Sequence, residues 1–381
     1  MNNLPAEKPR LLFLFSDTGG GHRSAAEAII EALQIDYGDA LTTRMVDIFK
    51  DYAPPPLNRF PRWYPRIVRV PQAWEIGYHI SDGHNRGRLL TSTFWPYVRR
   101  AAHKLIEQNP ADLIVSVHPL ANAPILRALG KTHPPYISVV TDLVTTHALC
   151  YHRRVDLCVV PTEAARERAL SNKMRPDQVI VVGLPVAERF CQPPGDRQAL
   201  RLHLGWPQDL PVAVLVGGGD GMGPLKTTAQ TIAASGLPLA MAIITGRNAD
   251  LKARLEAINW PLPTFIYGFV NEMPDFMRAA DILVTKAGPS TVCEAINAGL
   301  PMILYSRLPG QEDGNVDYVV GEGAGIWAPN PERIVSTLWD WIYHPEKRSQ
   351  AAANCQRIAN PRAAHQIAEI LARQVKIGVY K

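Results

Sequence analysis

The residues best suited to do chemistry near the start of the chain lie in "SDTGGGHRSAAEAI", residues 16–29, directly after the apolar run "LLFLF". His22 follows three glycines and opens a helix-like segment. Histidine is the most frequent general base, and the positive end of a helix dipole disfavours the imidazolium form. We therefore predict that His22 is a neutral base at a helix start, oriented by Asp17 or another carboxylate. Asp142, at the end of "ISVVTD", is the rival base, or else a turn-capping aspartate.

A second glycine-rich stretch, "GGGDGMGP" at residues 217–224, also follows an apolar run. Such a loop lets backbone N–H groups approach an anion at the start of a helix. It contains neither the GK[ST] of a Walker A loop nor a G-x-G-x-x-G fingerprint with its later acidic partner. The sequence therefore predicts an anion site or a plain tight turn here.

A third group of residues suits a sugar nucleotide. "TKAGPSTVCEAINAGLP" places residues 288–291 at a helix start, where free N–H groups and two hydroxyls can hold a diphosphate. Glu294, one turn later, can accept hydrogen bonds from both ribose hydroxyls. Lys286 adds positive charge, unless it is a surface lysine. "PGQEDGN" then offers Gln311, Glu312 and Asn315 to sugar hydroxyls, or is an ordinary polar turn.

No D-x-D triplet occurs in the chain. A metal-bridged diphosphate is therefore not expected, and helix N-termini with cationic side chains must neutralise the leaving nucleotide. We expect no metal site and no cofactor. The five cysteines are scattered without paired spacing, which favours reduced thiols over disulfides or a zinc site.

The elements that must position these residues alternate along the chain. Near-continuous apolar runs separated by helical patterns indicate parallel sheets covered on both faces. The strand–glycine loop–helix start occurs twice, at residues 13–26 and 214–230. At 381 residues, the chain is long enough for two doubly wound α/β domains in tandem. Ligands bind such sheets beyond the carboxyl ends of their strands, so two facing sheets suit an enzyme that joins two substrates.

Charge is unevenly placed. Between Arg59 and Lys104 there are eight arginines and one lysine against Glu75 and Asp82, so this segment carries 9 − 2 = +7 of a total of +5. Eight aromatic residues share the segment, and its prolines predict an irregular insertion in the first domain. Basic residues among Trp and Tyr suit an anionic lipid surface, although the same chemistry can grip RNA or form a solvated face. No segment has the roughly 20 apolar residues of a spanning helix, and no signal peptide is expected.

Several long motifs resemble one family. "SDTGGGHRSAAEAI", "TDLVTTH", "VGGGDGMGP", "ITGRN", "GFVNEMPDFMRAADILVTKAGPSTVCEA" and "GLPMILYSRLPGQEDGN" are similar to the monogalactosyldiacylglycerol synthases. Related enzymes are the bacterial diacylglycerol glucosyltransferases and the N-acetylglucosaminyltransferase of peptidoglycan lipid synthesis. The match runs in order from Phe13 to about Gly325. It implies a GT-B fold of two Rossmann-like α/β domains facing a cleft.

The resemblance implies an inverting transfer of galactose from UDP-galactose to 1,2-diacylglycerol, with UDP-glucose as the alternative donor. It places the acceptor and membrane on a first domain, 1–195, with the insertion at about 54–104. The UDP-sugar lies on a second domain, 196–355, and a last helix in 356–381 crosses back to the first. Expected partners are the UDP-sugar, diacylglycerol and anionic membrane lipids, without nucleic acid.

Site residues follow from the same resemblance. Uracil meets the backbone of Phe269 and Val270, ribose meets Glu294, and Gln311 and Glu312 hold the sugar. The remaining donor-site residues are Gly218, Gly219, Met222, Arg247, Lys286, Gly288, Pro289, Ser290, Thr291 and Asn315. The acceptor and membrane residues are Gly20, Gly21, Trp63, Arg66, Arg69, Trp74, Trp95 and His147.

Two departures affect the acceptor side. Ala148-Leu149-Cys150 stands where the family pattern predicts Pro-Thr-Trp, and the insertion varies within the family. The transit peptide of the plant members is missing, so a prokaryotic protein is expected, peripheral on the cytoplasmic face of the cell membrane. A UDP-N-acetylglucosamine 2-epimerase, or a non-enzymatic nucleotide-gated membrane- or RNA-binding protein, would be the rival interpretations.

Overall fold

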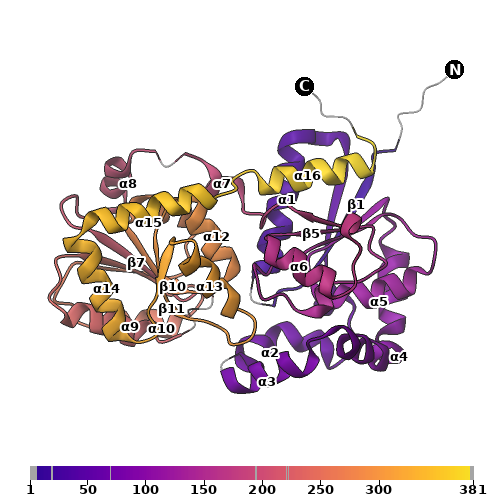
Figure 1. Cartoon of the computed structure of the whole chain (residues 1–381), viewed down its shortest axis with the longest axis horizontal. Coiled ribbons are helices and arrows are strands. Elements are labelled where there is room, and N and C mark those ends of the chain that lie inside the picture. The colour runs from indigo at the N-terminus through magenta and orange to yellow at the C-terminus, as the bar shows by residue number, and fades with distance from the viewer. Residues whose placement is uncertain are drawn as a thin grey trace. The chain divides into compact units, whose positions relative to one another are not determined.

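The computed structural model describes residues 7–18, 20–68, 70–193, 195–219, 221 and 223–377. The chain divides into two compact units, residues 1–188 with 362–381, and residues 189–361 (Figure 1). Each unit is built around one six-stranded sheet in which every paired strand is parallel. The predicted α/β class, with two doubly wound parallel sheets, is confirmed.

The first sheet has the strand order β2-β1-β3-β4-β5-β6. Its strands are β1 (Arg10–Phe15), β2 (Thr42–Asp47), β3 (Leu113–Ser116), β4 (Tyr136–Val139), β5 (Leu157–Val160) and β6 (Val179–Val181). Apolar runs such as "LLFLF" are buried along their whole length because helices cover both faces. The strand order reverses between β1 and β3, which is where a doubly wound sheet binds its ligand.

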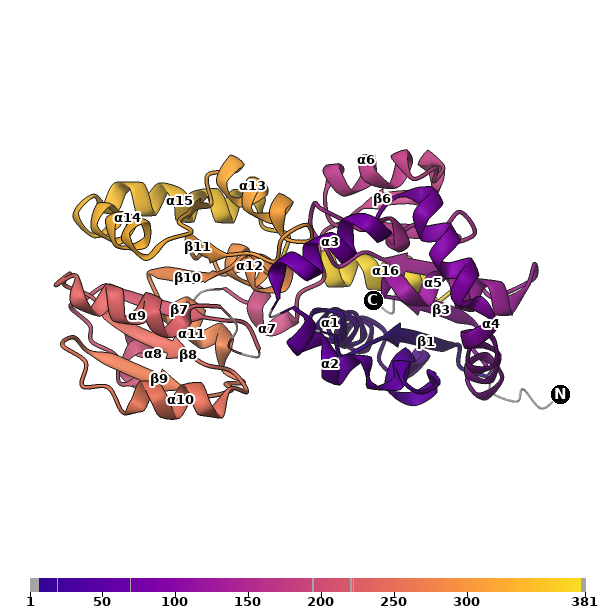
Figure 2. The same ribbon diagram turned by 90° about the horizontal axis from the view of Figure 1, so that it is seen from below.

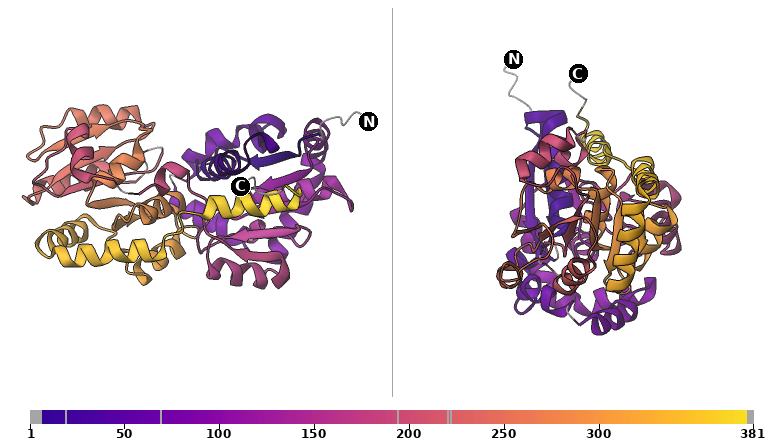
Figure 3. Two further views of the ribbon diagram at one scale, coloured as in Figure 1. Left: turned by 90° about the horizontal axis from the view of Figure 1, so that it is seen from above. Right: turned by 90° about the vertical axis from the view of Figure 1, so that its left-hand side faces the viewer.

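Helices of this unit are α1 (Gly21–Tyr37), α5 (Pro119–Leu129), α6 (Glu163–Ser171) and α16 (Ala363–Gln374). α16 comes from the far end of the chain and packs along α1 (Figure 3). Ile367 and Leu371 belong with Ile29 and Leu33 to one buried hydrophobic cluster. The C-terminal residues thus complete the hydrophobic core of the first unit. Short helical turns occupy Gly38–Ala40, Ile48–Tyr52, Leu57–Arg59, Ala148–Cys150 and Pro176–Gln178.

The basic aromatic insertion is helical, not irregular as its prolines predicted. It forms α2 (Phe60–Ile67), α3 (Pro71–Ser81) and α4 (His84–Gln108). Pro61 and Pro71 each stand in the first turn of their helix, where a missing N–H costs no hydrogen bond and the fixed φ favours the helix. α4 packs along α5, and Ala102 and Leu105 join the core on that side of the sheet.

The second sheet has the order β12-β11-β10-β7-β8-β9, and its central strands β10, β7 and β8 lie side by side (Figure 2). Its strands are β7 (Val212–Val216), β8 (Ala240–Ile244), β9 (Thr264–Tyr267), β10 (Ile282–Lys286), β11 (Met302–Ser306) and β12 (Gly325–Trp327). Its helices are α7 (Glu188–Cys191), α8 (Arg197–Leu204), α9 (Leu225–Ala234), α10 (Ala249–Glu256), α11 (Met273–Ala279), α12 (Pro289–Asn297), α13 (Asp313–Gly321), α14 (Pro331–Tyr343) and α15 (Pro345–Ile358). Here the strand order reverses between β7 and β10.

Candidate functional site

His22 lies at the start of α1, immediately beyond the carboxyl end of β1. Gly20 precedes the helix with φ 80°, a conformation that an L-residue adopts only with strain, and a Cβ there would meet no atom within 4 Å. Gly21 is the first residue of α1. Gly20 thus lets the chain turn sharply from strand into helix, and the space where its Cβ would stand is open.

The imidazole of His22 is held in one tautomer. Its Nδ1–H donates to the carbonyl of Val117, 2.8 Å away, and the Thr141 hydroxyl lies 2.9 Å from the same nitrogen. A carbonyl oxygen can only accept, so the proton of the neutral ring is on Nδ1 and Nε2 carries the lone pair. Burial lowers the pKa of His22 to about 4, against a smaller opposing contribution from Val117. His22 is therefore a neutral group able to take a proton at Nε2.

The carboxylate of Asp17 forms an ion pair with Arg23. Both of its carboxylate oxygens bind the guanidinium of Arg23, at 2.5 and 2.8 Å. Arg23 also lies over the ring of Phe15. The Val117 carbonyl holds the His22 ring without adding a charge, and orientation by a carboxylate stays a prediction.

A second histidine, His118, completes this site and was not singled out from the sequence. Its ring centroid is 4.5 Å from that of His22. The Leu120 N–H donates to its Nδ1, so Nε2–H donates to the Thr18 hydroxyl at 3.1 Å. Burial, with the neighbouring His22, lowers its pKa well below the usual range. The signal was present, because "ADLIVSVHP" ends in polar residues at the carboxyl end of a predicted strand.

Asp142 is buried three residues beyond the end of β4. Burial raises the pKa of Tyr78, and the nearby charge of Asp142 adds to this rise. His147 is also buried, with Leu149 N–H donating to its Nδ1 and Nε2 3.1 Å from the Ser81 hydroxyl. The structure thus places His22, His118 and Asp142 after three adjacent strands, β1, β3 and β4.

In the second unit, the loop after β7 is shaped by close backbone approach. Gly218 has φ 74°, and Gly221 has φ 59° with the Thr245 carbonyl only 2.4 Å from where its Cβ would stand. Arg247 N–H donates to the Gly219 carbonyl at 2.9 Å. This loop therefore joins the carboxyl ends of β7 and β8. Met222 lies outside the described residues.

Lys286 is not a surface lysine. Its Nζ is 2.5 Å from Oε1 of Glu312, whose side chain is 6% exposed, and Leu308 N–H donates to the other carboxylate oxygen at 2.8 Å. The lysine Cε is 3.3 Å from an ideal Cβ on Gly218, and Nζ is 2.8 Å from one on Gly288. One cation thus lies where the β7 loop, the start of α12 and the loop after β11 meet.

The start of α12 follows β10 directly. Pro289 occupies the first turn, and Ser290 and Thr291 are partly exposed beside it. Glu294 comes one turn later, and burial raises the pKa of its carboxyl to about 7, partly opposed by Arg189. This is the arrangement expected for a diphosphate at the helix N-terminus and a polar group one turn beyond it.

The remaining predicted donor residues surround this centre. Arg247 lies over the ring of Phe269, 5.0 Å from its centroid, and Phe269 is 56% exposed next to Val270. Asn315 is fully buried and donates to the Ala287 carbonyl at 2.8 Å, so its side chain braces the loop before α12. Gln311 lies one residue before Glu312, in the loop that leads into α13.

The predicted membrane residues differ in exposure. Trp63 and Arg66 are exposed on α2. Trp95, on α4, is partly buried against the hydrophobic core, and the guanidinium of Arg127 lies over its ring. Trp74 is partly buried against Tyr64. Arg69 lies outside the described residues. The exposed apolar side chains of the insertion are Trp63, Ile67, Val70, Ile76, Ile80, Leu89, Phe94 and Tyr97.

Among the residues that the structure describes, no group of three or more His, Cys, Asp or Glu side chains is arranged to hold a metal ion. Within the same part of the chain, none of the helices combines the length and apolarity needed to cross a bilayer.

Comparison with known proteins identifies relatives of this chain. Residues 22–186 match the model of the monogalactosyldiacylglycerol (MGDG) synthase family, and residues 213–371 match the C-terminal domain of glycosyltransferase family 28. Monogalactosyldiacylglycerol synthase 1, chloroplastic, of Arabidopsis thaliana is 36% identical over 96% of this chain and 71% of its own length. A probable monogalactosyldiacylglycerol synthase of Glycine max is 38% identical over 100% and 74%.

Solved structures share the fold at low identity. Acinetobacter baumannii MurG superposes with a TM-score of 0.62 at 15% identity, covering 96% of this chain and 99% of its own. The Staphylococcus aureus MnaA–UDP co-structure gives 0.63 at 12%, covering 97% and 98%. Two doubly wound units with this topology form a GT-B fold. The match to glycosyltransferase family 28 makes the chain a glycosyltransferase of this fold. The chain belongs to the monogalactosyldiacylglycerol synthase family.

These relatives correct one prediction. The sequence favoured the cytoplasmic face of a cell membrane, but the similar synthases of Arabidopsis, soybean and spinach are named chloroplastic. The predicted location is therefore wrong, because these relatives are named as chloroplast proteins. The error arose because the prediction rested on the missing transit peptide, and the residues at which a given sequence begins do not identify a compartment.

Proposed function

We propose that this protein transfers galactose from UDP-galactose to 1,2-diacylglycerol and forms β-monogalactosyldiacylglycerol. Family membership supports the reaction class, and the names of the relatives support galactose and diacylglycerol. The observation that carries the mechanism is the fixed tautomer of His22, whose Nε2 holds a lone pair at the switch point of the first sheet.

In this mechanism the primary hydroxyl of diacylglycerol attacks the anomeric carbon of galactose from the face opposite UDP. The new C–O bond forms as the bond to the UDP oxygen breaks, and the hydroxyl proton passes to Nε2 of His22. The electron pair of the broken bond leaves on UDP. The positive charge of Lys286 and the N–H groups at the start of α12 would stabilise that developing charge.

Asp142 is the rival base. It is buried three residues beyond β4, whereas His22 is partly buried and lies two residues after Gly20, where a Cβ would meet no atom within 4 Å. We therefore assign proton transfer to His22 and a supporting position to Asp142.

The exposed part of the insertion is proposed to bind anionic lipid. Ile76, Ile80 and Leu89 are between 60% and 69% exposed, and Arg86 and Arg88 are exposed beside them. Apolar side chains among arginines suit a surface of acyl chains and phosphates. Vesicles that contain an anionic phospholipid should bind the protein, and salt should weaken this binding. Binding that ignores lipid charge and salt would contradict the electrostatic part.

The test of the reaction is identification of the product. The purified full chain is incubated with diacylglycerol and, separately, with UDP-galactose, UDP-glucose or UDP-N-acetylglucosamine, and any glycolipid is analysed for its sugar and anomer. A β-galactolipid is expected. A glucolipid would support the alternative donor, an α-anomer would exclude inversion, and UDP-N-acetylmannosamine formed without diacylglycerol would identify an epimerase instead.

A further inference from the structure

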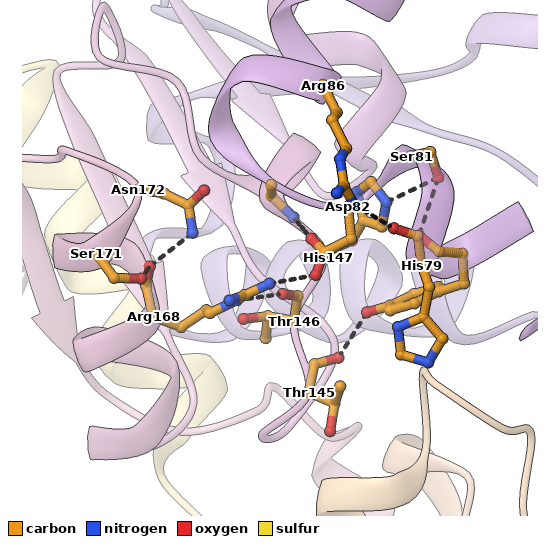
Figure 4. A network of polar contacts seen from close by, with 12 residues as sticks. His79, Ser81, Asp82, Arg86, Thr145, Thr146, His147, Arg168, Ser171 and Asn172 are labelled. Atoms are coloured by element: carbon orange, nitrogen blue, oxygen red, sulfur yellow. Dashed lines mark hydrogen bonds and ion pairs between the residues drawn. The ribbon is translucent and has the colours of Figure 1, made fainter. Parts of the chain in front are cut away.

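The loop of residues 143–150, which follows Asp142, is tied to the insertion by side chains at the end of α3 (Figure 4). The Tyr78 hydroxyl donates to the Thr145 carbonyl at 3.0 Å. The edge of the same ring packs on His147, whose Nε2–H donates to the Ser81 hydroxyl. Each contact joins the insertion to a loop that is distant in sequence.

Asp82, just beyond α3, is the centre of this network. Its Oδ1 accepts the Ala148 N–H at 2.9 Å, and its Oδ2 forms an ion pair with Arg168 from α6. Arg168 also donates from Nε to the Thr146 carbonyl at 3.3 Å. The Asp82 side chain is 18% exposed, so water competes little for these bonds. One carboxylate thus holds the loop against both α3 and α6.

The opposite face of α3 is exposed. Ile76 and Ile80 lie one helical turn apart and are 60% and 67% exposed. Beyond Asp82, α4 begins and Gly87 allows close approach, because an ideal Cβ there would be 3.2 Å from Leu149. The short segment from Ile76 to Gly87 therefore connects an exposed apolar surface with the loop next to Asp142.

We propose that Asp82 is a positioning residue that couples lipid binding by α3 to the arrangement of the 143–150 loop for the acceptor. This proposal rests on the proposed function. When α3 is held at a lipid surface, the Asp82 contacts hold the loop in its acceptor-binding arrangement, and without Asp82 the two regions respond independently. The acceptor and the surface that delivers it are then recognised together.

The first test is hydrogen–deuterium exchange of the full chain with phosphatidylcholine vesicles, with and without phosphatidylglycerol. In the wild-type protein, the mixed vesicles should slow exchange in both α3 and residues 143–150. In Asp82→Asn, which keeps an acceptor for Ala148 but loses the ion pair, only α3 should be protected. If vesicles leave α3 unchanged, the lipid-binding proposal fails. If the vesicles protect α3 but not the loop in the wild-type protein, the coupling proposal fails while the lipid-binding proposal stands. The same holds if the vesicles protect the loop equally in the wild-type protein and in Asp82→Asn.

The second test is kinetic. Asp82→Asn should raise the KM for diacylglycerol by about tenfold and leave the KM for UDP-galactose unchanged, as expected for loss of one charge-assisted bond on the acceptor side. Arg168→Gln should also raise the KM for diacylglycerol. Arg168→Lys, which keeps the positive charge, should raise this KM by less than Arg168→Gln does. Equal rises in both KM values, or no change in either, would overturn the proposal.

The chain offers a matched control. Asp112 likewise accepts a backbone N–H, that of Arg10 at 2.8 Å, and forms an ion pair with the Arg10 side chain. However, Asp112 lies just before β3, at the amino-terminal ends of the strands of the first sheet. Asp112→Asn should change neither the loop exchange nor the KM for diacylglycerol. A response equal to that of Asp82→Asn would show a general loss of stability and not a positioning role.

Discussion

The rings of His22 and His118 lie 4.5 Å apart, tilted by 58°, at the switch point of the first sheet. Each ring is neutral and each has a defined tautomer, because His22 donates to Val117 and His118 accepts from Leu120. Two imidazoles this close cannot both become charged at low cost. The pair therefore keeps one proton acceptor, Nε2 of His22, ready at neutral pH.

His22→Ala should lower the rate of sugar transfer by about 10²- to 10⁴-fold, the usual contribution of a general base, while UDP binding stays near normal. Initial rates and UDP titration measure the two effects separately. His133→Ala is the control, because Nδ1 of His133 is also 2.8 Å from a carbonyl, that of Pro134. His133 precedes β4 and so lies at the amino-terminal ends of the strands, away from the proposed site. Transfer at the wild-type rate by His22→Ala would exclude His22 as the base.

His118→Asn should move the acid limb of the pH–rate profile upward. Burial holds the pKa of His22 at about 4, so the wild-type rate should fall only as the pH approaches 4 and the ring gains its proton. The smaller Asn can still accept the Leu120 N–H and cap α5, but it admits water beside His22 and raises the pKa of that ring. An acid limb identical in both proteins, with equal thermal stability, would show that His118 does not act through His22.

Much of this site could be predicted from the sequence, because continuous apolar runs and glycine-rich turns are local signals. They located both sheets, the start of α1 and the start of α12. The polar end of the predicted strand pointed to His118, but its contact with His22 was not predictable, since it forms only after β3 pairs with β1 across nearly one hundred residues. The insertion was misjudged as irregular because proline was weighed as a helix breaker, whereas Pro61 and Pro71 stand in first turns.

The environment of Lys286 was likewise invisible in sequence, because its partner Glu312 is supplied by a separate loop. Lys286→Gln should raise the KM for UDP-galactose and lower stability by about 3 kcal/mol, since it leaves Glu312 buried without its cation. Thermal unfolding and donor kinetics measure these effects. The double variant Lys286→Gln/Glu312→Gln should recover stability but not donor binding. A double variant as unstable as the single one would contradict the ion pair as the cause.

His365 on α16 predicts a pH-dependent stability of the first unit. Its Nδ1 lies 2.8 Å from Asp36 and its Nε2 lies 2.9 Å from Glu188. Burial alone would lower the pKa of His365, but the bonds to these two carboxylates outweigh it and raise the pKa above 6.5. A raised histidine pKa stabilises the fold below the unfolded value, and this stability is lost as the pH rises through the folded value.

The melting temperature of the wild-type chain should therefore fall more between pH 6 and pH 8 than that of His365→Gln, by an amount equivalent to roughly 1 kcal/mol for these partly exposed groups. His203→Gln, on α8 of the second unit, serves as the control for loss of a histidine. Equal pH dependence in wild type and His365→Gln would show that the two ion pairs contribute nothing to stability.

Glu294 predicts a pH dependence of donor binding in the opposite direction. Burial raises the pKa of its carboxyl to about 7, against a smaller opposing contribution from Arg189, so this carboxyl titrates near neutral pH. A carboxylate accepts hydrogen bonds from two ribose hydroxyls better than the protonated acid does. UDP-galactose affinity should therefore rise between pH 6 and pH 8. UDP-galactose is the suitable probe, because the terminal phosphate of UDP titrates in the same pH range and would obscure the measurement.

Glu294→Gln should bind UDP-galactose about tenfold more weakly at pH 8, since one charge-assisted bond is lost, and its affinity should not rise between pH 6 and pH 8. Calorimetric titration at each pH gives both quantities. A rise of equal size in Glu294→Gln would assign the titration to another group, and unchanged affinity at pH 8 would remove Glu294 from the ribose site.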